Sequence, residues 1–304
     1  MTKLLYLECT SGISGDMVAA ALLDAGASEE AVRRALDSLD VEGFSVEITR
    51  VRKSGLDVCD FNVVLDVAHE NHDHDMAYLH GRDHARVQDH GHACERGRDH
   101  EHGHGHDHDH VHGHGDDARH SHGNGHSHGE HHHRGPCEIA ALIDGAAMTE
   151  GAKTIAHAVF GYVAAAEARA HGVPVEEVHF HEVGAVDSIA DIVAIAVAAD
   201  DLACDGVVVA DLPCGYGTVR CQHGLIPVPA PATAFIAEAA GLPLAPIDVE
   251  GELVTPTGAA VAAALRTHDA LPERFAIRAI GAGAGKRAYD TPGILRAMII
   301  EPLA

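Results

Sequence analysis

Apolar and polar positions in the first 67 residues follow three different spacings. An apolar run at residues 3–9 predicts a buried strand, and helical spacing at residues 15–25 and 29–39 predicts two helices. Alternating positions at residues 44–52 and 58–67 predict two strands, and the Lys-Ser-Gly turn between them indicates an antiparallel hairpin. The chain therefore begins as a mixed α/β structure.

The pattern stops at His69 and resumes near Pro136. Of the 28 His residues, 22 lie between His69 and His133, where Leu, Ile, Val and Phe nearly vanish. Such a segment buries too little apolar surface to offset the entropy lost on ordering. We predict a disordered, metal-binding surface insert at residues 69–135, between two parts of one α/β domain at residues 1–68 and 136–304.

The part after the insert alternates between helical and strand patterns. Helices are predicted at residues 148–171, 187–202, 232–240 and 258–267. Strands are predicted at residues 206–210, 275–280 and 293–300. Residues 178–185 suit a strand or a loop, and the Gly- and Pro-rich stretch 212–232 is expected to lack regular structure. Together these elements predict an α/β fold with a mixed sheet flanked by helices.

Charge and cysteine content limit the classes of partner and the cellular compartment that suit the chain. The chain has 21 Lys and Arg against 46 Asp and Glu, a net charge of −25. This balance argues against nucleic acid or an anionic membrane as partner and suits cations. Seven scattered Cys match no disulfide framework, and no apolar run has the length of a signal peptide or a membrane span. We expect a cytoplasmic protein.

The His-rich insert predicts metal binding. Neutral imidazole suits Ni, Zn, Cu and Co, and the Gly between successive His lets the backbone wrap around an ion. Without fixed spacing, several ions should bind weakly and exchangeably, with affinity falling below about pH 6.5 as imidazole protonates. The alternative is a solvated low-complexity linker. The candidate ligands in its densest run are His102, His104, His106, His108, His110, His112 and His114.

The motif SGISGDM, residues 11–17, lies between a predicted strand and a predicted helix. The free N–H groups of a helix start bind anions, so Ser11, Gly12, Ser14 and Gly15 are candidates for phosphate binding. The alternative is a structural turn with Asp16 in the first helical turn.

The motif HFHE, residues 179–182, suggests a metal site or a proton-transfer pair. In an extended segment His179 and His181 point to the same face, and Asp187 and Asp191 share a face of the next helix. A purely structural His pair is the alternative.

Three further groups are candidates. Cys214, Cys221 and His223 have the composition of a soft metal site, although their spacing is wider than in common zinc pairs and favours His223 over the thiols. Thr255 and Thr257 open a predicted helix and either cap it or hold a phosphate or carboxylate. Gly281, Gly283 and Gly285 with Lys286 and Arg287 are expected to form a flexible cationic loop that contacts an anion.

Five motifs in order carry a resemblance to a known family. They are SGISGDM, VHFHEVGAVDSI with a downstream DI, HGLIPVPAPAT, GELVTPTGAA and GAGAGKR. The series resembles the nickel insertion proteins of the nickel-pincer nucleotide cofactor, from near the N-terminus to about Arg296. That family also tends to carry a His-rich tract at this place.

The resemblance implies an activity. Family members insert Ni²⁺ into pyridinium-3,5-bisthiocarboxylic acid mononucleotide, a chelatase-type lyase reaction that depends on CTP with Mn²⁺ or Mg²⁺ and matures a lactate racemase. A nickel–carbon bond requires loss of a ring proton, so His181 and Glu182, with Asp16, are the expected catalytic residues.

The chain also departs from the family pattern. It ends at EPLA, where full-length members continue into a CTP-linked domain that is separately encoded or joined by a frameshift in some cases. Glu8 stands where Asp is common, and Cys214 and Cys221 lie outside the shared pattern. Alternative readings are a nickel-storage or chaperone module, and another metal-dependent hydrolase. A homo-oligomer is compatible with the sequence.

Overall fold

The computed structural model describes residues 2–66, 76–79, 134–178, 180, 186–221 and 223–303. The helices are α1 Gly15–Asp24, α2 Glu29–Asp37, α3 Met76–Leu79, α4 Pro136–Gly145, α5 Glu150–His171, α6 Val186–Leu202, α7 Pro231–Ala240 and α8 Pro256–Leu265, with a 3-10 turn at Val175–Glu177. The strands are β1 Leu4–Glu8, β2 Phe44–Lys53, β3 Leu56–Leu65, β4 Gly206–Val209, β5 Leu212–Tyr216, β6 Thr218–Cys221, β7 Gly224–Pro227, β8 Leu244–Glu250, β9 Phe275–Ala284 and β10 Ile294–Pro302.

The main sheet has six strands in the order β2-β3-β9-β10-β1-β4. It is mixed, because β1 pairs antiparallel with β10 and parallel with β4. The predicted hairpin is confirmed, with β2 and β3 antiparallel along their whole length. The remaining strands of the described part form two small sheets, β5-β8 and β6-β7. The predicted mixed α/β fold is confirmed.

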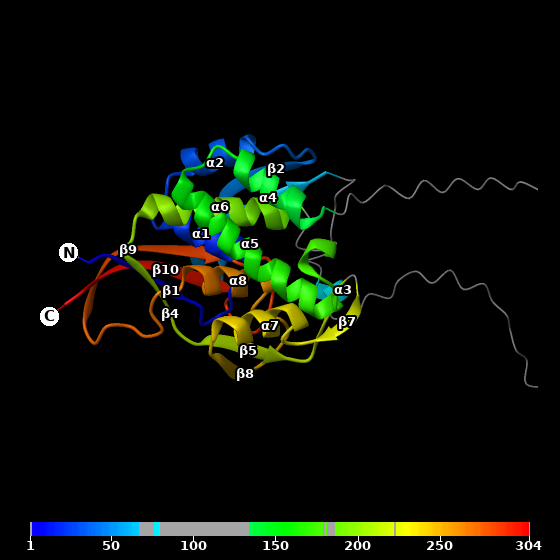
Figure 1. Cartoon of the computed structure of the whole chain (residues 1–304). Coiled ribbons are helices and arrows are strands. Elements are labelled where there is room, and N and C mark those ends of the chain that lie inside the picture. The colour runs from blue at the N-terminus through cyan, green and yellow to red at the C-terminus, as the bar shows by residue number, and fades with distance from the viewer. Residues whose placement is uncertain are drawn as a thin grey trace, which may run out of the picture. The chain divides into compact units, whose positions relative to one another are not determined.

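Helices cover the sheet in successive layers (Figure 1). Helix α1 packs directly on β3, β9 and β10, α6 packs on α1 and α2, and α5 packs on α6. Helix α6 is rich in Ala, Val and Ile and is buried on most of its faces. A helix that is apolar all round needs partners on all sides, which explains its place between α1 and α5.

Glycines in β9 allow α1 to lie against the sheet. A Cβ on Gly283 would stand 2.0 Å from the carbonyl oxygen of Met17, and one on Gly281 would stand 2.1 Å from that of Ala21. The expectation of a flexible loop at residues 281–287 was therefore wrong for its first part, because Gly281 and Gly283 lie in β9. These glycines permit close packing of backbone on backbone.

Other expectations also need correction. The stretch 212–232 contains β5, β6 and β7, and residues 231–232 begin α7, so it does not lack regular structure. Backbone pairing with β8 and within the β6-β7 hairpin orders it despite its Gly and Pro. Helix α4 was missed, although Pro136 opens it and the Glu138 side chain accepts a hydrogen bond from the Gly135 N–H at 2.8 Å.

The predicted disordered insert, residues 69–135, was wrong at residues 76–79, which form α3. Most of the remaining insert, including the candidate ligands His102 to His114, lies outside the described residues.

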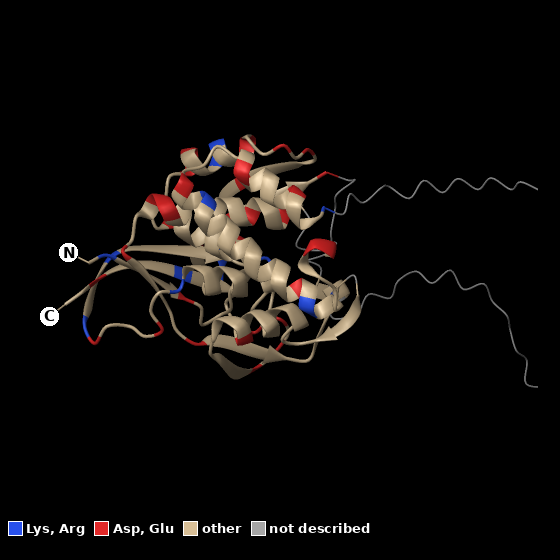
Figure 2. Ribbon diagram, viewed as in Figure 1, with Lys and Arg blue, Asp and Glu red and all other residues tan. Residues whose placement is uncertain are grey.

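No helix in the described ranges is both long and apolar enough to cross a membrane. Acidic positions are spread over the helical layer, and α4 and α6 carry acidic but no basic residues (Figure 2).

Substitution of Gly283 by Ala should lower the free energy of unfolding by about 1–3 kcal/mol, because the added methyl group overlaps the α1 backbone. The matched control is Gly161→Ala on α5, where a Cβ meets nothing within 4 Å. That control should raise stability by about 0.5–1 kcal/mol. Chemical denaturation measures both, and equal effects of the two substitutions would contradict the packing argument.

Candidate functional site

The starts of four helices in the described part meet at one cavity of about 300 Å³. Helix α1 contributes Ser14, Gly15 and Asp16, and α8 contributes Thr255, Pro256 and Thr257. Asp187 and Ser188 come from the start of α6, and Ala230 precedes α7. A helix start carries a partial positive charge and N–H groups that no carbonyl oxygen of the same helix accepts from, although a cap satisfies some of these groups. The cavity therefore concentrates hydrogen-bond donors for an anion.

Two backbone hydrogen bonds hold the starts of α1 and α8 side by side. The Ile13 N–H donates to the Leu253 carbonyl oxygen at 2.9 Å, and the Thr255 N–H donates to the Ile13 carbonyl oxygen at 3.1 Å. Thr255 also caps α8, because its hydroxyl accepts a hydrogen bond from the Gly258 N–H at 3.1 Å. The motifs SGISGDM and GELVTPTG, some 240 residues apart in the sequence, thus form one structural unit.

Carboxylates gather at the α1 side of the cavity. A Cβ on Gly15 would stand 2.2 Å from Oδ2 of Asp191, so the start of α1 lies directly against this side chain of α6. Asp16 and Asp187 line the same cavity, and the Ser14 hydroxyl donates a hydrogen bond to Asp16. Oxygen ligands of this kind suit a divalent cation.

Cationic side chains at the same cavity are held by acidic partners or by carbonyl oxygens. Lys286 Nζ lies 2.5 Å from Oδ1 of Asp60, and Arg287 Nη1 lies 2.5 Å from Oε2 of Glu252, whose side chain is only 5% exposed. Lys53 Nζ donates hydrogen bonds to the carbonyl oxygens of Gly285 and, at 3.1 Å, Arg287. These contacts fix the conformation of residues 285–287.

Burial shifts the pKa values of two side chains next to these cations. Burial lowers the pKa of the Lys53 ammonium and nearby Lys286 adds to this, whereas Asp16 and Asp60 act in the opposite direction. Burial also raises the pKa of the Tyr289 hydroxyl, and Glu252 adds to the effect against Arg287. Sequence reasoning assigned no role to Lys53, Asp60, Glu252 or Tyr289. The sequence could have indicated Glu252 as a site residue, because it lies within the GELVTPTG motif.

An apolar wall completes the cavity. It is lined by Met17, Phe61, Val63, Leu65, Val219, Ile226 and Leu253. One side of the site thus favours a flat, apolar ring and the other favours charged groups.

Most residues selected from the ordered motifs meet at this cavity. The structure places Ser11, Ser14, Gly15, Asp16, Asp187, Asp191, Thr255, Thr257, Lys286 and Arg287 along its lining. Gly12 is not among the lining residues. Its φ of 109° and its close approach to the Leu253 carbonyl oxygen, 2.3 Å from a would-be Cβ, give it a structural role. His179, His181 and Glu182 lie outside the described residues, so their roles stay predictions.

The structure gives Cys214, Cys221 and His223 different surroundings. Cys221 lines the cavity, and its sulfur accepts a hydrogen bond from the His223 N–H at 3.3 Å. The His223 ring stacks against His171 at 4.9 Å between centroids, and burial together with His171 lowers the pKa of His223. The Cys214 thiol donates to the Gly215 carbonyl oxygen at 3.4 Å. Within the described ranges, no three His, Cys, Asp or Glu side chains are arranged to hold a metal.

One protein family matches the chain along almost its whole length. The family model described as nickel insertion protein matches residues 5–303. The chain belongs to the nickel insertion protein family. No solved structure matches it.

Relatives within the nickel insertion family carry a fuller description. The chain is 44% identical over 301 residues, 99% of its length, to a pyridinium-3,5-bisthiocarboxylic acid mononucleotide nickel insertion protein of Alkaliphilus metalliredigens, covering 61% of that protein. It is 36% identical over 302 residues, 98% of its length, to a protein of the same name from Geobacillus kaustophilus, covering 60%. The chain thus spans about three fifths of the length of these relatives.

Replacement of Arg287 by Met should lower the free energy of unfolding by about 3 kcal/mol, because the buried Glu252 carboxylate loses its counter-charge. The double variant Arg287→Met with Glu252→Leu removes both charges and should recover most of this loss. Chemical denaturation of the two variants tests the pair. Equal losses in the single and the double variant would show that the ion pair does not matter to this member of the nickel insertion family.

Proposed function

We propose that this chain binds pyridinium-3,5-bisthiocarboxylic acid mononucleotide in the cavity and transfers Ni²⁺ to it. The observation that carries the proposal is the meeting of four helix starts, an apolar wall and three aspartates in one cavity of a nickel insertion family member. A volume of about 300 Å³ suits one ligand of mononucleotide size.

The phosphate of the mononucleotide is assigned to the starts of α1 and α8. Backbone N–H groups there provide donors, and Thr257, Lys286 and Arg287 line the same space. A dianionic phosphate is stabilised by both the helix dipoles and the cations. Because Lys286 and Arg287 already have carboxylate partners, the helix starts and the lining residue Arg220 are assigned a share of the positive potential that the phosphate meets.

The pyridinium ring with its thiocarboxylates is assigned to the apolar wall of Phe61, Val63 and Val219 and to the neighbouring aspartates. Ni²⁺ is a substrate of the reaction. Asp187 and Asp191 are proposed to hold it weakly through oxygen ligands beside the two sulfurs, with His179 and His181 as further ligands.

The step that forms the nickel–carbon bond is a substitution at the ring carbon between the two thiocarboxylates. The C–H bond breaks, its electron pair goes to nickel, and the proton passes to a base. We assign this base to His181 or Glu182, assisted by the charge of Asp16. The His-rich insert supplies nickel and takes no part in the bond-forming step.

CTP with Mn²⁺ or Mg²⁺, implied by the family resemblance, is proposed as a further requirement. The cavity has room for one nucleotide, so CTP is not expected to share it with the substrate.

Substitution of Asp191 by Asn should reduce nickel insertion by roughly 10–100-fold, because one charged ligand or positioning group at the metal is lost. Formation of the metallated mononucleotide is followed by mass spectrometry with Ni²⁺ and CTP, with and without the additional region found in the longer relatives. The matched control is Asp37→Asn, an exposed aspartate on α2 outside the cavity. A wild-type chain that binds nickel but never yields product under either condition would instead indicate a storage module.

Substitution of Lys286 by Met should raise the half-saturating concentration of the mononucleotide by about 10–100-fold, because a charge-assisted hydrogen bond to phosphate is lost. The dephosphorylated nucleoside is the matched control substrate. The substitution should leave nucleoside binding almost unchanged. Equal weakening of both ligands would remove Lys286 from the phosphate site.

A further inference from the structure

Helix α3 is a short element that lies against the rim of the cavity. The Ala288 N–H donates a hydrogen bond to Sδ of Met76 at 3.4 Å, and the Arg220 guanidinium lies 5.3 Å from the centre of the Tyr78 ring. Leu79 is only 2% exposed. Met76–Leu79 thus contacts the body of the protein through three of its side chains.

Four residues are too few for a stable isolated helix, because the first helical turn fixes many dihedral angles for one hydrogen bond. Contacts with the rest of the protein must therefore hold α3 in place. Burial of the Leu79 side chain and the contact between the Arg220 guanidinium and the Tyr78 ring both stabilise the docked helix. The sequence around α3 is polar and rich in His, so these apolar side chains stand out within it.

The surface that receives α3 belongs to the cavity. Arg220 lies on β6 and lines the cavity, and Ala288 stands between the lining residues Arg287 and Tyr289. Helix α3 is drawn beside the β6-β7 hairpin in Figure 1, and its contacts are with β6. Helix α3, which lies within the part of the sequence that contains 22 His residues, therefore contacts the protein at the rim of the cavity.

We propose that α3 is an anchor that delivers the His-rich segment to the mouth of the cavity, so that bound nickel is released next to its acceptor. This inference rests on the proposed function. In this role Tyr78, Leu79 and Met76 are positioning residues, and Arg220 and Ala288 form the receiving surface.

The number of residues between a His and its attachment to the protein predicts how much the anchor raises the local nickel concentration. His84 is five residues from Leu79 but 18 residues from Asp66, the last described residue after β3. Effective concentration in a tethered reaction falls with about the −3/2 power of tether length. Loss of the anchor should therefore lower the local nickel concentration about sevenfold for a site at His84 and about twofold for a site at His102.

A first experiment tests the anchor without any enzyme activity. The chain contains no Trp, so Leu225→Trp introduces a single fluorophore at an exposed position of β7 paired with Arg220. Added Ni²⁺ bound by the His-rich segment should quench this Trp. The double substitution Tyr78→Ala with Leu79→Ala should reduce the quenching several-fold, whereas Tyr78→Phe keeps the ring and should behave like the parent chain. Equal quenching in all three proteins would overturn the anchor.

A second experiment tests delivery. In the insertion assay, Tyr78→Ala with Leu79→Ala should raise the half-saturating Ni²⁺ concentration by about two- to sevenfold and leave that of the mononucleotide unchanged. In a background that lacks residues 84–130, the same substitution should have no effect on the nickel dependence. A shift in mononucleotide affinity, or the same nickel shift without residues 84–130, would assign α3 to support of the cavity wall and overturn the delivery role.

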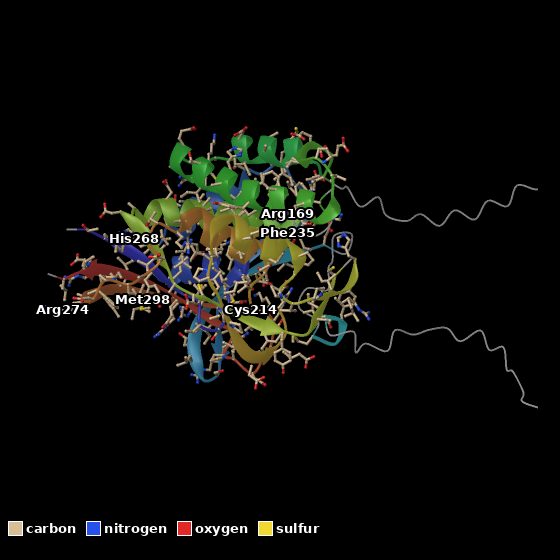
Figure 3. All side chains as sticks on the ribbon, turned by 60° about the horizontal axis from the view of Figure 1, so that its bottom comes forward. Arg169, Cys214, Phe235, His268, Arg274 and Met298 are labelled. Atoms are coloured by element: carbon tan, nitrogen blue, oxygen red, sulfur yellow. The ribbon has the colours of Figure 1, made fainter. Side chains whose placement is uncertain are left out.

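Loss of an aromatic contact elsewhere provides a control for general destabilisation. The Arg169 guanidinium carbon lies 4.2 Å from the centre of the Phe235 ring. Arg169 belongs to α5 and Phe235 to α7, and both are labelled in Figure 3. Phe235→Leu removes this contact and should leave Trp quenching unchanged. If the wild-type chain forms no metallated product at all, the proposed function fails, and the quenching experiment alone still decides whether α3 anchors the segment.

Discussion

The position of the cavity depends on the direct contact between the backbone of α1 and strand β9. Gly281 and Gly283 have no side chain to separate the two, and Gly15 at the start of the same helix lets Asp191 of α6 approach from the other side. Helix α1 is thus held between sheet and helix with little freedom to shift. Because protein interiors are close-packed, even one added methyl group would move the helix start and the donors that it presents.

This constraint bears on how an acidic protein could form the proposed site for an anionic nucleotide. The chain carries a net charge of −25, and two of the cations that line the cavity, Lys286 and Arg287, are paired with Asp60 and Glu252. The helix starts add the positive ends of their dipoles, which are fixed in direction, and an aspartate stands in the first turn of both α1 and α6. In the proposed complex these aspartates face Ni²⁺ and the starts of α1 and α8 face the phosphate, so that the two kinds of group act on different parts of the ligand.

The sequence predicted the parts of this arrangement that are local. Thr255 as a helix cap, the β2-β3 hairpin and the start of α1 after Ser14 follow from short-range stereochemistry and motif order. Gly281 and Gly283 were misinterpreted as flexible, because only the three-dimensional structure supplies the helix that packs on them. Lys53 and Glu252 were missed for a related reason. Their partners lie 234 and 35 residues away, and a polar residue before a turn or inside a Gly-rich motif gives no sign of such a contact.

Nickel transfer also requires that the protein not compete with its substrate for the metal. The product holds nickel between two sulfurs and a carbon, so protein thiolates near the route would retain the metal, since soft sulfur ligands bind nickel more strongly than carboxylates. Burial raises the pKa of Cys9, just before the SGISGDM motif, to about 12, and that of Cys59 to about 11. Both thiols therefore stay protonated at neutral pH and are poor ligands, which leaves Cys221 as the thiol among the lining residues of the cavity. In the proposed reaction nickel then moves from imidazole and carboxylate to the sulfurs of the mononucleotide, a direction that ligand preference alone favours.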